Sequence, residues 1–136
     1  MTCREMADEI QERLLGMGFT IHRLDAHTTS SVYLKVDCGL CHSIRIGDHP
    51  GKRHLRYRYN IGPWIQRFRS DHDPCQRWYF PVGEVDRMVR FIEYDRGSRM
   101  IELGGKQRYD EEVERMRERG GRMRMGFWTR CREVTR

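Results

Sequence analysis

The sequence predicts an α+β domain in which an antiparallel four-stranded meander is packed by an N-terminal helix and two C-terminal helices. Three observations support this: a helix-capping pattern opens the chain, four alternating segments follow, and helical spacing of apolar residues returns after residue 83. A chain of 136 residues with 38% hydrophobic content has the size of one domain. We expect this domain to span residues 1–120, with residues 121–136 as a basic, arginine-rich tail.

The first helix is indicated by the spacing of Thr2 and Glu5, which is that of a capping box. In such a box the hydroxyl and the carboxylate accept hydrogen bonds from free amides at the helix N-terminus. Gly16 and Gly18 supply a stop for this helix. Its apolar stripe, which we expect to be core, consists of Met6, Ile10, Leu14 and Met17.

Four segments alternate between apolar and polar residues at the period of a β-strand, namely residues 19–24, 31–37, 42–48 and 54–60. Short turns join them, so they are expected to pair as consecutive antiparallel neighbours. Residues 62–81 follow with no regular period, and part of this segment is expected to cover the sheet.

Helical spacing returns after Gly83, with Glu84 and Asp86 placed at the positive end of a helix dipole. This helix is predicted to pack on the sheet through Val85, Met88, Val89 and Ile92. A third, highly charged helix is predicted over about residues 109–119, on the surface or facing a partner. Its apolar stripe consists of Tyr109, Val113 and Met116.

The net charge of +6 is concentrated at the C-terminal end. Residues 115–136 hold eight arginines and two glutamates, whereas the other 114 residues hold 18 basic and 18 acidic residues. Guanidinium groups pair with phosphates and stack on rings, so this segment suits contact with nucleic acid or an acidic protein face. A solvated, frayed terminus is the alternative. The charged start and the lack of a long apolar run predict a cytoplasmic protein in a bacterial host.

The segment Cys38-Gly39-Leu40-Cys41-His42 matches the pattern of covalent haem attachment, but no export signal accompanies it and it lies between two strands. Zinc is the better metal hypothesis, because a second chelating pair follows about thirty residues later. The candidate ligands are Cys38, Cys41, His72 and Cys75. A plain hairpin turn explains Gly39 without any metal, and we therefore expect no cofactor unless zinc is bound.

Two loop clusters, Asp48-His49 and Asp71-His72-Asp73, could supply acid, base and metal ligands to a phosphodiester hydrolase. Both are equally good turn sequences, since aspartate bonds to backbone amides and the following proline fixes φ. No glycine-rich phosphate loop or nucleophile elbow is present. We therefore predict that the protein is not an enzyme.

Binding is easier to argue from the residues. In a strand over residues 54–60, Arg56 and Arg58 share one face and could contact phosphates or carboxylates, while the alternate tyrosines face the core. The alternative is an ordinary half-exposed strand with solvated arginines. The candidate partner-binding residues are Arg45, Arg56, Arg58, Arg122, Arg124 and Trp128.

Three stretches, residues 31–36, 43–52 and 55–61, resemble small proteins of phages, prophages and other mobile elements that carry an R-I-S-D-H signature on a strand pair. In this chain the signature reads Arg45-Ile46-Gly47-Asp48-His49, with Gly47 in place of the serine. The resemblance implies a mobile-element setting, in which proteins of this size often inhibit bacterial defence, as anti-CRISPR proteins do.

The leading hypothesis is therefore a non-enzymatic phage or prophage protein that inhibits a bacterial defence nucleoprotein by binding to it. The positive charge argues against mimicry of nucleic acid, because a mimic must be acidic. A nucleic-acid-binding module, with or without zinc, is the first alternative. A metal-dependent nuclease is the second.

Overall fold

The computed structural model describes residues 2–47, 58–62, 78–81 and 85–136. The elements follow the order α1 (Cys3–Gly16), β1 (Ile21–Asp25), β2 (Val32–Val36), the 3₁₀ turn η1 (Asp37–Gly39), β3 (Ser43–Gly47), β4 (Arg58–Gly62), β5 (Trp78–Pro81), α2 (Val85–Leu103), α3 (Lys106–Gly121), α4 (Phe127–Arg130) and β6 (Arg132–Val134). The fold is α+β, as predicted.

The strands form one six-stranded antiparallel sheet in the order β5-β4-β3-β2-β1-β6. Its centre is the predicted meander of β1 to β4, with β4 at residues 58–62 rather than 54–60; residues 54–57 lie outside the described part of the chain. Two strands extend it beyond the prediction. β5 arises in the segment without a regular period, and β6 arises in the expected tail.

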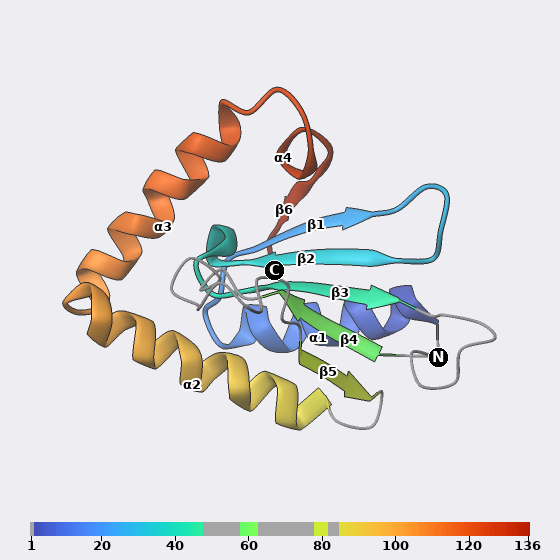
Figure 1. The fold of residues 1–136 in the computed structure, drawn as a ribbon, viewed down its shortest axis with the longest axis horizontal. Helices are drawn as coiled ribbons and strands as arrows, with labels where there is room; N and C mark the ends of the chain where they lie inside the picture. The colour runs from blue at the N-terminus through green and yellow to red at the C-terminus, as the bar shows by residue number, and fades with distance from the viewer. Residues whose placement is uncertain (1, 48–57, 63–77, 82–84) are drawn as a thin grey trace, which may run out of the picture.

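The position of β6 changes the expected domain boundary. Residues 121–136 were expected to form a tail outside the domain, but β6 pairs with β1, so the end of the chain lies beside its first strand (Figure 1). Val134 is opposite Ile21 and is buried in the main core. Residues 132–134 therefore belong to the sheet.

One face of the sheet carries the main core, which is covered by α1 and the first half of α2 (Figure 1). The predicted capping box of α1 is present: Thr2 Oγ1 accepts from the Glu5 amide at 3.1 Å, and Glu5 Oε2 accepts from the Thr2 amide at 3.2 Å. The predicted stripes of both helices face this core. Its buried helical residues include Met6, Ile10, Leu14, Met88, Val89 and Ile92.

A second, smaller cluster joins α3 to the turn between β2 and β3. Tyr109 and Val113 of α3 pack there against Cys38 and Leu40. The Tyr109 hydroxyl donates to Asp37 Oδ2 at 2.5 Å, and burial raises the pKa of Asp37 even though its hydrogen bonds oppose this shift. The apolar stripe of α3 thus packs within the chain, while most of its charged side chains are exposed, so the helix lies on the surface as predicted.

No helix in the described part of the chain is long and apolar enough to cross a membrane.

Candidate functional site

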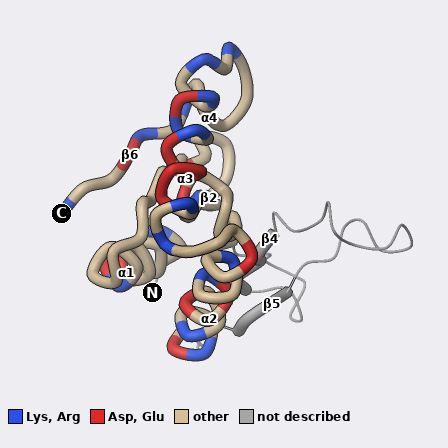
Figure 2. Tube along the Cα trace, turned by 90° about the vertical axis from the view of Figure 1, so that its left-hand side faces the viewer, with Lys and Arg blue, Asp and Glu red and all other residues tan. Residues whose placement is uncertain are grey.

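The most distinctive surface of the protein is an arginine-rich edge that runs from the end of α3 to the start of β6. We call it the basic edge and define it by five exposed side chains, Arg119, Arg122, Arg124, Arg130 and Arg132. No aspartate or glutamate occurs between residues 119 and 132. Figure 2 shows basic residues along the loop between α3 and α4 and at the start of β6.

The arginines of the basic edge form no ion pair with any other described residue, whereas two arginines one turn earlier do. Arg115 pairs with Glu112, and Arg117 pairs with both Glu114 and Glu133. Glu112, Glu114 and Glu133 are therefore engaged by Arg115 and Arg117, and the guanidinium donors of the basic edge are available to an external partner.

Trp128 fixes the basic edge to the body of the protein. Its indole ring lies directly over Gly120, so closely that a Cβ atom on Gly120 would meet ring atoms at 2.4 Å. The ring also meets the His22 ring edge-on, with centroids 4.8 Å apart, and the Lys35 ammonium lies 5.6 Å from its centroid. These contacts hold the segment in place, since cation–π and edge-on ring contacts add to the burial of apolar area.

The strand β6 adds a second attachment. Glu133 accepts from Arg117 at 2.9 and 3.3 Å and lies 3.2 Å from His22 Nε2. Burial lowers the pKa of His22, although the negative charge of Glu133 opposes that shift. Contacts within the chain thus attach the basic edge at both ends of the loop.

Two exposed methionines alternate with the central arginines of the basic edge. Met123 lies between Arg122 and Arg124 and is 50% exposed, and Met125 follows Arg124 and is 77% exposed. Flexible thioether side chains adapt to varied apolar surfaces, including aromatic rings. The surface therefore offers apolar contact beside its positive charge.

The structure brings together only part of the predicted binding set. Arg122 and Arg124 lie on the basic edge, and Trp128 supports it from the inside. Arg45 lies on β3, with β2 and β1 between it and β6, and its half-buried guanidinium is 5.8 Å from the Tyr33 ring centroid. Arg56 lies outside the described residues, and only the backbone of Arg58, in β4, is described.

Three members of the basic edge were not among the predicted residues, namely Arg119, Arg130 and Arg132. The signal for them was the charge excess of residues 115–136, which does not say which arginines pair within the chain. Only the structure separates the paired Arg115 and Arg117 from the others.

The predicted zinc ligands are not shown to meet. The turn that carries both cysteines sends Cys38 into the second cluster and Cys41 into the main core. His72 and Cys75 lie outside the described residues, as do the two loop clusters considered for a nuclease. Among the described residues, the one group with metal-ligating spacing is Cys41, His42 and Asp95. Of these, the sequence had indicated only Cys41 as a zinc ligand.

Cys38 and Cys41 have little nucleophilic character. Burial raises the pKa of Cys38 to about 11 and raises that of Cys41 further, so both are thiols at neutral pH. Cys41 is fully buried, and its thiol donates to the Ile92 carbonyl at 3.5 Å. The Cys41, His42 and Asp95 group is therefore poorly suited to attack a substrate.

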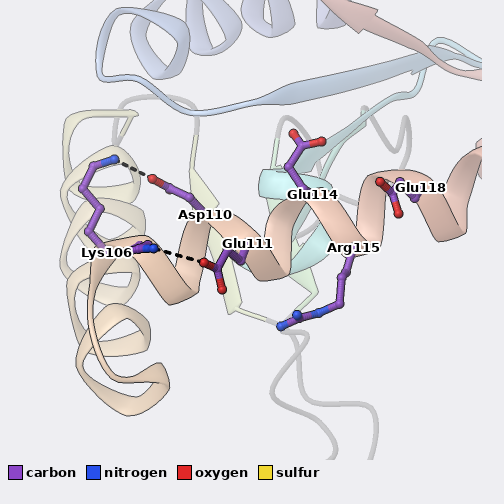
Figure 3. A pocket seen from close by; sticks show the side chains of 7 residues that line it. Lys106, Asp110, Glu111, Glu114, Arg115 and Glu118 are labelled. Atoms are coloured by element: carbon purple, nitrogen blue, oxygen red, sulfur yellow. Dashed lines mark hydrogen bonds and ion pairs between the residues drawn. The ribbon is translucent and has the colours of Figure 1, made fainter.

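A second charged surface lies on the outer face of α3, and it differs from the basic edge because its charges are mostly paired (Figure 3). Lys106 Nζ lies 2.6 Å from Asp110 Oδ2, and Gln107 donates to Glu111 at 3.3 Å. All the residues that line this shallow pocket come from α3. Its paired charges make it a weaker candidate than the basic edge.

Comparison with protein-family models, with curated proteins and with solved structures finds no match for this chain.

Proposed function

We propose that the protein works by binding rather than catalysis, and that its basic edge grips the acidic or phosphate-rich surface of a nucleoprotein. The observation that carries this proposal is the group of five exposed arginines of the basic edge, which form no ion pair with another described residue. In the mobile-element setting that the sequence resemblance implies, the target is a bacterial defence nucleoprotein and binding inhibits it.

The physical support comes from the positive charge of the basic edge and from the contacts that already hold this segment on the protein. Each guanidinium can donate two parallel hydrogen bonds to a phosphate or a carboxylate, and neutralised phosphates release counterions. Because Trp128 and β6 already hold the segment, binding does not have to order a loose tail. Met123 and Met125 can cover apolar groups next to the charges.

A nucleic-acid-binding module is the second candidate, since the same edge could contact RNA or DNA with no protein target. A strong decrease of affinity with rising salt, for naked nucleic acid, is the property that would favour it. The metal-dependent nuclease stays a prediction whose residues, Asp48 and His49 among them, lie outside the described part of the chain.

The proposal is tested by affinity purification of the full chain from a bacterial host with active defence systems, with and without nuclease treatment. The double variant Arg122→Glu with Arg124→Glu reverses two charges of the basic edge. The matched control, Arg90→Glu with Arg108→Glu, makes the same charge change at exposed positions in the first half of α2 and the first turn of α3. Mass spectrometry identifies the proteins captured by each.

The expected result is a defence effector that resists nuclease, binds wild type and control, and is lost with Arg122→Glu, Arg124→Glu. Recovery of nucleic acid alone, removed by nuclease and by raised salt, would replace the inhibitor proposal by the second candidate. Equal capture by both double variants would remove the basic edge from the binding surface.

A further inference from the structure

Three potential metal ligands, two neighbours in the turn between β2 and β3 and one in α2, lie close together. Cys41 and His42 come from the end of that turn, and Asp95 comes from the middle of α2. One ligand atom from each, a sulfur, an imidazole nitrogen and a carboxylate oxygen, lies within 4.8 Å of the other two. This juxtaposition is independent of the basic edge.

The buried imidazole of His42 is unusual because its polar atoms are poorly satisfied. Its side chain is 2% exposed, and neither ring nitrogen has a hydrogen-bond partner in the described part of the chain. Nε2 lies 2.7 Å from Asp95 Oδ2, but the two atoms are not aligned for a hydrogen bond, and Oδ2 also lacks one. Because most buried polar side-chain atoms are hydrogen-bonded, this arrangement calls for an explanation.

We propose that Cys41, His42 and Asp95 form a binding site for a divalent zinc ion that ties the β2–β3 turn to α2. Thiolate, imidazole and carboxylate are the three ligand types that zinc takes in proteins, and a water molecule can complete the tetrahedron. The ligand atoms of such a tetrahedron lie about 3.3–3.8 Å apart. The cluster would have to adjust by about 1 Å, and the direct His42–Asp95 contact would give way to two bonds to the ion.

The surrounding charges are compatible with a doubly positive ion. The Cys41 thiolate and the Asp95 carboxylate together balance the charge of zinc. Arg99 lies 3.4 Å from Asp95 and adds a positive charge, which Glu102 balances at 3.2 Å from the same guanidinium. Zinc binding would release the proton of the Cys41 thiol, because the ligand is the thiolate.

This ligand set differs from the one that the cysteine spacing suggested. Cys38 packs with Tyr109 and Val113 in the second cluster, whereas Cys41 lies in the main core. A site built on Cys41, His42 and Asp95 does not need the Cys38 thiol. That difference provides the control for the experiment.

The experiment is a titration of the full, reduced chain with Co²⁺, which substitutes for zinc and gives a near-ultraviolet absorption band when a thiolate binds it. We expect one Co²⁺ per chain, displaced by Zn²⁺. The band should vanish in Cys41→Ser and persist in Cys38→Ser. Asp95→Asn should weaken binding by about tenfold or more while leaving the buried cysteine in place.

Far-ultraviolet circular dichroism shows whether each variant is folded, and Asp95→Asn decides the matter if Cys41→Ser does not fold. The wild-type melting temperature should also rise with added Zn²⁺, because an ion that binds only the folded state stabilises it. A wild-type chain that gives no thiolate band would reduce the cluster to an ordinary buried ion pair and overturn the proposal. Loss of the band in Cys38→Ser would overturn the ligand set.

Discussion

The charged residues of α3 before residue 118 differ from those after it in whether they have ion-pair partners, and the sequence does not reveal this difference. Before residue 118, Lys106 Nζ lies 2.6 Å from Asp110 Oδ2 and Arg115 pairs with Glu112, so these charges are paired within the helix. Past residue 118 no carboxylate follows until Glu133, and that residue is taken by Arg117 and His22. Whether a charge has a partner, rather than how many charges there are, separates a solvated face from a candidate binding surface.

The largest expected effect comes from the contact between Trp128 and Gly120, which attaches the basic edge to α3. Gly120→Ala would drive a Cβ atom into the Trp128 ring, which must then move, so we expect a loss of about 1–3 kcal/mol in the free energy of unfolding. Urea unfolding measures this loss.

Gly121→Ala is the matched control for that substitution, because nothing lies within 4 Å of a Cβ atom there. At this position alanine should be neutral or stabilise the helix by up to about 1 kcal/mol. Equal effects at the two glycines would show that Trp128 does not hold the basic edge.

The next prediction compares how the unpaired and the paired positive charges contribute to binding of a polyanion. Arg122→Gln with Arg124→Gln should elute from a heparin column at clearly lower salt than the wild type, since each lost arginine removes a contact with the polyanion. Lys106→Gln with Arg115→Gln removes the same amount of positive charge from the part of α3 whose charges are paired. Its elution should shift much less, and an equal shift would mean that net charge alone controls binding.

The smallest expected effect is a pH dependence of stability at His22, which contacts Trp128 and Glu133 beside the basic edge. Because burial lowers the pKa of His22 below 6.5, the unfolded chain takes up a proton there at a higher pH than the folded chain. The free energy of unfolding should therefore decrease as the pH falls through 6.5. The decrease between pH 7.5 and 5.5 should be smaller than about 1 kcal/mol.

The measurement is urea unfolding of wild type and His22→Gln at both pH values. The variant should lose less stability on acidification than the wild type. Identical losses would show that His22 does not report on the attachment of β6.

The elements that could be predicted from the sequence are those whose signals are local. The capping box of Thr2 and Glu5 and the apolar stripe of α1 lie within one segment, and β2 and β3 alternate cleanly. β6 has only three residues and one apolar side chain, Val134, so it becomes a strand only because β1 offers a free edge. Such short segments depend on tertiary context.

The candidate sites show the same limit. Arg122 and Arg124 were found from composition, but the inward role of Trp128 depends on the absence of a side chain at Gly120. The approach of His42 to Asp95 joins residues far apart in the chain, and no spacing rule connects them. The cysteine spacing suggested a shared ligand role for Cys38 and Cys41, whereas the left-handed backbone at Cys38, with φ of 58°, leads them into different clusters.

The pairing of β6 with β1 also has a consequence for synthesis. β1 leaves the ribosome more than one hundred residues before its outer partner, because Ile21 pairs with Val134. Until then β1 presents an open edge on which a neighbouring chain could add a strand. Residues 132–134 cover this edge by pairing with β1, and a chain truncated before residue 132 would leave the edge open to strand addition.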